Sequence, residues 1–171
     1  MAMKSIGDLV KDQQVLTAEP GTKILDVVEL MKERGIGAVP VVKDGELVGI
    51  FSERDLLTKV VSQCKDADEQ TIEKITGMTV GEVMTKELVI ANYADTCDEC
   101  LKKMRLHGIR HLPVVAEGEL IGIISIRDLL LCHLVVKEEE LDLLNTFINF
   151  VPPSMSSVKE PTFREQTKNP T

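Results

Sequence analysis

The sequence predicts a mixed α/β (α+β) fold that consists of two β-α-β-β-α repeats and a C-terminal helix. The main observation is an internal repeat: Gly35–Leu56 (GIGAVPVVKDGELVGIFSERDL) recurs 73 residues later as Gly108–Leu129 (GIRHLPVVAEGELIGIISIRDL), and 14 of the 22 aligned positions are identical. The second observation is that helical and β-rich patterns follow in the same order around both copies. A unit this small cannot bury its apolar side alone, so we expect the two copies to pack face to face.

The first repeat begins with helical patterns. A short helical segment within residues 5–14 precedes a brief strand at Val15–Thr17. Thr22 is predicted to cap the next helix, whose apolar residues recur at helical spacing. Gly35 is predicted to end that helix, because glycine readily adopts the left-handed conformation of a helix C-terminus.

A β-hairpin and a second helix complete the first repeat. Ala38–Val42 and Leu47–Phe51 are β-rich, and the Asp44-Gly45 pair between them predicts a tight hairpin turn. The second helix is predicted to begin at Ser52 and to extend to about Gln63.

The second repeat follows a polar, acidic linker that contains a predicted short helix at Glu69–Ile75. Its predicted elements are a short helix at Val80–Met84, a strand at Leu88–Ile90, a helix capped by Asp95 that extends to Leu106, strands at His111–Val115 and Leu120–Ile124, and a helix from Ile126.

The predicted boundaries follow from this pattern. Residues 1–76 form repeat 1 with its linker, and residues 77–136 form repeat 2. Residues 137–151 form an amphipathic C-terminal helix, and residues 152–171 form a polar, proline-broken tail that is predicted to be disordered. The polar residues of this last helix are mostly acidic, whereas helices that bind membrane surfaces are typically basic. We therefore expect the helix to pack on protein, with a homodimer contact as the leading interpretation.

Composition excludes several function classes. The net charge is −8, and a nucleic-acid interface would need a clustered basic surface. No apolar run approaches the ~18 residues that span a bilayer, and the N-terminus lacks the pattern of a signal peptide. Four cysteines without disulfide-framework spacing favour reduced thiols and a cytoplasmic location.

Both repeats contain a Ser-x-Arg-Asp motif at the predicted start of a helix. The motif is Ser52-Glu53-Arg54-Asp55 in the first repeat and Ser125-Ile126-Arg127-Asp128 in the second. The structural interpretation is a capping box, in which the serine caps the helix and the aspartate reaches back to the free amide. A cap does not require the arginine, however, and a glycine three residues before each serine indicates a close approach to the strand. A carboxylate at such a place suits the hydroxyls of a ribose, and both interpretations can hold together.

These motifs resemble a tandem pair of CBS domains, the module named after cystathionine β-synthase. The resemblance covers roughly residues 5–136 and rests on the repeated β-α-β-β-α order, the Gly-x-x-x-x-Pro-Val-Val segments and the Ser-x-x-Asp motifs. It implies a body with pseudo-two-fold symmetry, in which two clefts bind adenosine-containing ligands such as AMP, ADP or ATP, with S-adenosylmethionine and NAD as further candidates. It also implies a homodimer and a regulated partner protein.

The resemblance also implies a set of binding residues. The predicted ribose-binding residues are Asp55, Asp128, Ser52 and Ser125. The predicted adenine-contacting residues are Thr17, Ala18, Ile36, Ile90, Ala91 and Ile109. The predicted phosphate-binding residues are Arg110, His111, His107, Arg54 and Arg127.

The phosphate set is asymmetric between the repeats. Repeat 2 has His107, Arg110 and His111 where repeat 1 has Arg34, Gly37 and Ala38. The two histidines could be ordinary helix-end and strand residues, but an arginine and a histidine in sequence can together bind a phosphate. Our hypothesis is that the cleft with Asp55 borrows this pair and binds phosphates better than the cleft with Asp128. An imidazole of ordinary pKa would then tighten binding as the pH falls from about 7.5 to 6.5.

Cys97-x-x-Cys100 could be a redox motif or half of a zinc site, but the sequence has only one such pair. The alignment places Cys97 at the position of Ile24 and Cys100 at that of Val27, both on the apolar stripe of a helix. Packing in the core is therefore the favoured interpretation of both thiols. Neither Cys64 nor Cys132 shows a functional pattern.

The function predicted from the sequence is a regulatory module that senses adenine nucleotides. No catalytic residues, metal site or required cofactor are predicted, because no catalytic constellation or phosphate-binding lysine motif is present. The alternative keeps the fold without a ligand, so that the aspartates only cap helices and the chain is a dimerisation or docking scaffold. A third hypothesis is a thiol oxidoreductase that uses Cys97 and Cys100.

Overall fold

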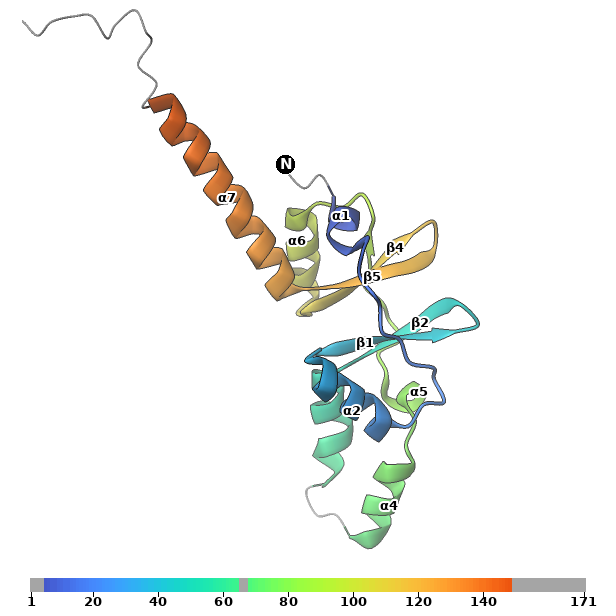
Figure 1. Ribbon diagram of the computed structural model, residues 1–171. Coiled ribbons are helices and arrows are strands. Elements are labelled where there is room, and N and C mark those ends of the chain that lie inside the picture. Colours follow the sequence, from blue (N-terminus) through green and yellow to red (C-terminus); the bar gives the residue numbers. More distant parts are fainter. Residues whose placement is uncertain (1–4, 65–67, 149–171) are drawn as a thin grey trace, which may run out of the picture. The chain divides into compact units, whose positions relative to one another are not determined.

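The computed structural model of the protein describes residues 5–64 and 68–148 (Figure 1). The chain divides into two compact units, residues 1–134 and residues 135–171, and both repeats lie in the first. The predicted tail at 152–171 lies outside the described residues.

The prediction of two β-α-β-β-α repeats is confirmed. The elements around repeat 1 are α1 (Ile6–Val10), α2 (Ile24–Arg34), β1 (Ala38–Lys43), β2 (Glu46–Ser52), α3 (Glu53–Asp55), the π-helix η1 (Leu56–Val60) and the 3-10 helix η2 (Val61–Cys64). The linker and repeat 2 contain α4 (Glu69–Gly77), α5 (Val80–Val83), β3 (Ala91–Asn92), α6 (Cys97–His107), β4 (His111–Ala116), β5 (Glu119–Ser125) and α7 (Ile126–Ile148).

The two hairpins share one geometry. β1 and β2 pair antiparallel with a register shift between Val41 and Val42, and β4 and β5 pair with the same shift 73 residues later. The predicted turn is confirmed, because Asp44 and Gly45 both have positive φ, at 51° and 85°. Positive φ at both central residues matches the type I′ turns that suit the twist of a hairpin.

Both predicted first strands are wrong by one to three residues. In repeat 1 only Ala18 pairs: its N–H donates to the Pro40 carbonyl at 3.0 Å, and Val42 N–H donates to the Ala18 carbonyl at 2.9 Å. In repeat 2 the strand is β3, which pairs parallel to β4. The β-rich residues before each of them indicate propensity, but a strand forms only where the chain reaches a partner.

Two predicted helix caps are also wrong. α2 begins after Lys23, and the Thr22 hydroxyl accepts a hydrogen bond from Glu19 N–H instead. α6 is capped by Thr96 in a capping box, while Asp95, one residue earlier, pairs with Lys103 at 2.5 Å. In both cases a polar side chain close to the helix start has a better partner elsewhere.

The C-terminal helix predicted at 137–151 is not a separate element. α7 continues without a break from Ile126 to Ile148 and contains both the last helix of repeat 2 and most of this segment. No described helix is long and apolar enough to cross a membrane.

The short helices at the repeat boundaries are exchanged between the repeats. α1, at the N-terminus, contributes Ile6 and Val10 to the core around β4 and β5. α5, which precedes repeat 2, contributes Val80 and Val83 to the core of repeat 1. Figure 1 shows α1 beside β5 and α5 beside β2. The core of each repeat therefore contains the short helix that precedes the other repeat in the sequence.

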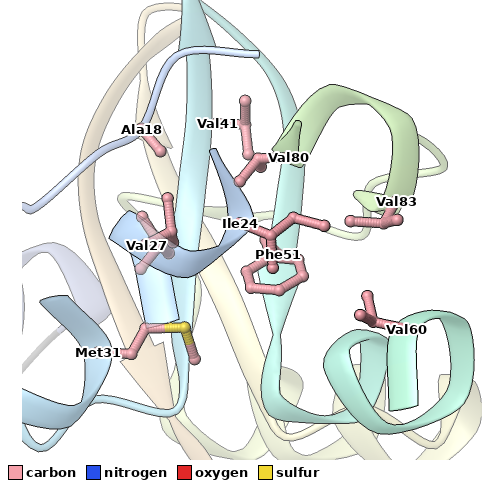
Figure 2. Close-up of a cluster of buried hydrophobic side chains, with 10 residues drawn as sticks. Ala18, Ile24, Val27, Met31, Val41, Phe51, Val60, Val80 and Val83 are labelled. Atoms are coloured by element: carbon pink, nitrogen blue, oxygen red, sulfur yellow. The ribbon is translucent and has the colours of Figure 1, made fainter. Parts of the chain in front are cut away.

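The core of repeat 1 is a cluster of aliphatic side chains around one aromatic ring (Figure 2). Phe51, on β2, is fully buried, as is Ile24 at the start of α2. The core of repeat 2 has the same plan, with Ile124 at the position of Phe51 and Cys100 at the position of Val27. β2 and β5 end at Ser52 and Ser125, so the packing of the two cores fixes the positions of both Ser-x-Arg-Asp motifs.

Candidate functional site

The motif of repeat 1 forms the capping box that the sequence predicts. Ser52 ends β2 and is the N-cap of α3. Its backbone N–H and its hydroxyl both donate to Asp55 Oδ2, at 3.0 and 2.7 Å, and Asp55 N–H donates back to the hydroxyl at 3.4 Å. The local sequence is thus sufficient to place both side chains.

The second oxygen of Asp55 is also occupied. Lys59 Nζ lies 2.6 Å from Asp55 Oδ1, and Thr85 Oγ1 donates to the same oxygen at 2.9 Å. Burial alone would raise the pKa of this carboxyl, but the hydrogen bonds from Lys59, Ser52 and Thr85 outweigh it and lower the pKa below its usual value. Asp55 is therefore a buried, ionised carboxylate that accepts two hydrogen bonds on each oxygen.

A pocket of about 150 Å³ opens beside Asp55. It lies between the repeats, and its lining residues are Gly37, Ile50, Ser52, Glu53, Arg54, Asp55, Thr85, Ile109, Arg110 and His111. The structure thus brings together two predicted ribose-binding residues, three predicted phosphate-binding residues and one predicted adenine-contacting residue. The pairing of Asp55 with Arg110 and His111 across the repeats is the arrangement that the sequence asymmetry suggested.

Arg54 lines the pocket but already has a partner. Its guanidinium donates to the backbone carbonyl of Gly108 at 2.5 Å, at the end of α6 in the opposite repeat. The arginine therefore links the two repeats beside the pocket that it lines. This contact gives Arg54 a structural role, and it leaves Arg110 as the more available cation of the pocket.

The surroundings of His111 favour the neutral form of its imidazole. Burial lowers the pKa of its imidazole, and the nearby Arg110 lowers it further, against the opposing effects of Glu53 and Asp128. An added Cβ at Gly37 would lie only 3.0 Å from the His111 ring, so the glycine makes room for the imidazole. The prediction of tighter binding between pH 7.5 and 6.5 assumed an ordinary pKa, and the lowered pKa in the unliganded protein argues against that assumption. The pH dependence of binding itself stays a prediction.

The motif of repeat 2 forms the same capping box in a more exposed setting. Ser125 N–H and hydroxyl donate to Asp128 Oδ2 at 2.9 and 2.6 Å. The position equivalent to Lys59 is Cys132, and in the part of the chain that the structure describes no Lys or Arg nitrogen pairs with Asp128. Arg127 is exposed and is not among the residues that line the described pocket.

Asp128 has no threonine partner like the Thr85 hydroxyl beside Asp55, and the environment of β5 explains this difference. In repeat 1 the backbone of Thr85 pairs with Ile50, which brings the threonine hydroxyl to Asp55. In repeat 2 the side-chain amide of Gln13 replaces that backbone, donating to the Ile123 carbonyl at 3.0 Å and accepting from Ile123 N–H at 2.8 Å. No threonine therefore reaches Asp128 in this way.

The other predicted binding residues lie outside the lining of this pocket. The backbone groups of Ala18 hydrogen-bond to β1, and Ala91 pairs with β4. The backbone groups of these two predicted adenine-contacting residues are therefore engaged in strand pairing. His107, at the end of α6, is exposed. Of the adenine set only Ile109 lines the pocket; the residues outside its lining are Thr17, Ala18, Ile36, Ile90 and Ala91.

Sequence reasoning missed Lys59, Thr85 and Glu53 as members of this site. Lys59 follows Asp55 by four residues, a spacing that commonly forms ion pairs on helices, and could have been found. Glu53 lies inside the motif but was not assigned a role. Thr85 lies 30 residues from Asp55, and only the pairing between β2 and the chain after α5 brings it there.

The cysteine pair of α6 is unsuited to rapid thiol chemistry. Cys100 is fully buried, as core packing predicts, and burial raises the pKa of its thiol to about 11. Burial, together with the Cys132 thiol, raises the pKa of Cys97 to about 12. Because the thiolate is the nucleophile, these values argue against the oxidoreductase hypothesis. Within the described ranges no group of three His, Cys, Asp or Glu side chains could hold a metal ion.

Comparisons with known proteins identify the family. The CBS domain model matches residues 6–62 and 80–134. The CBS domain-containing protein YhcV of Bacillus subtilis is 34% identical over 127 residues, which are 74% of this chain and 84% of YhcV. The solved structure of ATU1752 from Agrobacterium tumefaciens, also a CBS-domain containing protein, has a TM-score of 0.66 and 32% identity over 75% of this chain and 98% of its own. CBSX2 of Arabidopsis thaliana, solved in complex with AMP, has a TM-score of 0.65 and 28% identity over 79% and 99%. Since the family model matches more than half of the chain, in two tandem segments, this protein belongs to the CBS-domain family.

Proposed function

We propose that the protein is a regulatory module that binds an adenine nucleotide in the pocket beside Asp55. The observation that carries the proposal is the convergence of Ser52 and Asp55 from one repeat with Arg110 and His111 from the other. A diol acceptor and a phosphate-binding pair are thereby present in one cavity. The complex of the related CBSX2 with AMP supports this choice of ligand class.

Binding at Asp55 requires a rearrangement of its hydrogen bonds. All four acceptor positions are filled, so a ribose diol would compete with Lys59 or Thr85 for Oδ1. Lys59 can yield at low cost, because its side chain is 40% exposed and also donates to the Val83 carbonyl at 2.8 Å. The nucleotide would then connect the two repeats, and it would regulate the protein by favouring the conformation that it binds more tightly.

The predicted homodimer and regulated partner belong to the same proposal. Leu130, Leu131 and Leu134 on α7 are exposed in the single chain, as are Leu141 and Leu144 further along the helix. Exposed leucines on one helix are typical of a surface that a second protein covers. A non-catalytic module needs such a contact to transmit its ligand state.

The decisive experiment compares AMP with adenosine by isothermal titration calorimetry. In Arg110→Ala the affinity for AMP should fall at least tenfold, because a charge-assisted hydrogen bond contributes about 1.5–3 kcal/mol. Adenosine has no phosphate, so wild type and Arg110→Ala should bind it equally. Arg105→Ala, which removes an exposed arginine of α6 that does not line the pocket, is the matched control and should bind AMP as wild type does.

Two outcomes would contradict the proposal at different points. Equal losses of AMP and adenosine affinity in Arg110→Ala would mean that the arginine does not contact the phosphate. No heat and no thermal shift with AMP, ADP, ATP, S-adenosylmethionine or NAD would reject a nucleotide site altogether, since a ligand at 100 times its Kd should stabilise the fold by about 2.7 kcal/mol.

The lowered pKa of His111 leads to a separate expectation for pH. Between pH 7.5 and 6.5 the AMP affinities of wild type and His111→Gln should change in parallel, because the lowered pKa of the wild-type imidazole disfavours its protonation. The comparison with His111→Gln removes the titration of the phosphate itself, whose pKa is about 6. A ratio of affinities that grows severalfold toward pH 6.5 would show that bound phosphate protonates His111.

The scaffold alternative is favoured by one observation, the complete hydrogen bonding of Asp55 without a ligand. A carboxylate that caps its helix and pairs with Lys59 has a structural role whether or not nucleotide binds. The same calorimetric titrations separate the two functions, because a scaffold would respond to none of the nucleotides.

A further inference from the structure

A pair of thiols lies between α6 and α7. Cys97, in the first turn of α6, and Cys132, in the second turn of α7, have their Sγ atoms 3.0 Å apart. The next residue on each helix makes a second contact, in which His133 Nδ1 lies 3.7 Å from Asp98 Oδ1. Two neighbouring contacts thus hold the two helices in one register at this point.

We propose that Cys97 and Cys132 are an oxidation site that closes to an intramolecular disulfide and fastens the start of α6 to α7. The sulfur atoms need to approach by only about 1 Å to reach bonding distance. The other two cysteines are placed differently: Cys100 faces the core and is fully buried, and Cys64 is exposed with its thiol directed to the Val60 carbonyl at 3.7 Å. The motif spacing pointed to Cys97 with Cys100, whereas the geometry selects Cys97 with Cys132.

This site is present in one repeat only. The aligned positions in repeat 1 are Ile24, which is buried in the core, and Lys59, which pairs with Asp55. Repeat 2 therefore has a thiol where repeat 1 has the cation that holds its aspartate. The helix that the disulfide would fasten is also the one whose first residues form the capping box of Ser125 and Asp128.

A small-molecule disulfide such as oxidised glutathione can supply the oxidising equivalents. The Cys97 thiolate, which is the more exposed of the two, attacks one glutathione sulfur, and the glutathione S–S bond breaks. The Cys132 thiolate then attacks the Cys97 sulfur of this mixed disulfide and displaces the second glutathione. Two protein thiols are oxidised, one glutathione disulfide is reduced to two thiols, and the two protons end on the released glutathione.

The reaction should be slow at neutral pH. Burial and the hydrogen bond with Cys132 raise the pKa of Cys97 to about 12, so its thiolate is scarce at pH 7. The oxidation rate should therefore rise about tenfold for each pH unit between about 7 and 9. The site would respond to sustained oxidation rather than to a brief exposure.

The test incubates the full chain with oxidised glutathione at about pH 8.5 and counts free thiols. The count should fall from four to two through the disulfide, or to one where glutathione also modifies the exposed Cys64, and the product should remain a monomer on a non-reducing denaturing gel. Peptide mapping should recover Cys97 and Cys132 in one disulfide-linked pair. The Tm of the oxidised protein should be higher by several degrees and should return to its original value on reduction, because a cross-link between residues 35 positions apart restricts the unfolded chain.

Matched variants locate the effect. Cys64→Ser removes the exposed thiol and should still lose two thiols, from three to one, while Cys97→Ser should form no intramolecular disulfide. A linkage of Cys97 to Cys100, a disulfide between two chains, or stable glutathione adducts without loss of a thiol pair would each overturn the proposal. The mapping uses wild-type protein, so the result does not depend on whether a variant folds, and it is independent of nucleotide binding.

Discussion

Replacing Phe51 with alanine should lower the free energy of unfolding by about 3–5 kcal/mol. Phe51 is fully buried and is the aromatic side chain of the repeat 1 core, in one cluster with Ile24 of α2 and Val83 of α5 (Figure 2). Alanine would lose the transfer free energy of the ring and leave a cavity between β2 and the helices that cover it. Urea unfolding followed by circular dichroism measures the change.

The control for this variant is Leu57→Ala, which truncates an exposed leucine six residues after Phe51. Leu57 is 60% exposed, so its truncation should change stability by less than about 0.5 kcal/mol. Ile124→Ala tests the equivalent position in repeat 2 and should cost about 2–5 kcal/mol. A loss below about 1 kcal/mol in Phe51→Ala would show that the core of repeat 1 is not packed as described.

The second large effect is expected at Asp55. Asp55→Ala should lower the free energy of unfolding by about 2–3 kcal/mol, because it removes the capping acceptor of Ser52 and the partner of Thr85 and Lys59. The matched control is Asp128→Ala, which removes the same capping box at an exposed position without a cation and should cost about 0.5–1 kcal/mol. Equal losses in the two variants would mean that Lys59 and Thr85 add nothing.

The same variant predicts a pH dependence with a defined sign. The pKa of Asp55 is lowered in the folded protein, so the unfolded chain binds this proton more tightly. The stability that the carboxylate contributes is therefore complete above the unfolded pKa of about 3.9 and is lost as the pH falls through the lower folded value. Unfolding measured from pH 7 to 3 should show a constant gap between wild type and Asp55→Ala down to about pH 5, and a narrowing gap below about pH 4.

Much of the site could be predicted because it is local in sequence. Ser52 and Asp55 are three residues apart, and a capping box follows from that spacing at a helix start. The 73-residue repeat then placed Ser125 and Asp128 in the same geometry without further information. The suggestion that Arg110 faces Asp55 needed the family resemblance, because no spacing in the chain relates them.

The predictions from sequence were wrong where a side chain or a strand had more than one available partner. Thr22 and Asp95 are good caps by residue type, but each lies one residue too early and bonds elsewhere. The spacing of Cys97 and Cys100 attracted a redox interpretation, while the partner of Cys97 is Cys132, 35 residues away on another helix. Residue type and spacing describe what a group can do, and packing selects its partner.

The sequence by itself determined the two repeats, their hairpins with Asp-Gly and Glu-Gly turns, and the capping boxes that begin their last helices. All of these depend on interactions within a few residues, which local composition specifies. Only the tertiary structure decided that α1 and α5 complete each other's repeats, that Thr85 reaches the second oxygen of Asp55, and that the pocket takes Arg110 and His111 from the opposite repeat. These contacts join segments tens of residues apart, and their formation depends on how two complete cores pack together, which no short stretch of sequence encodes.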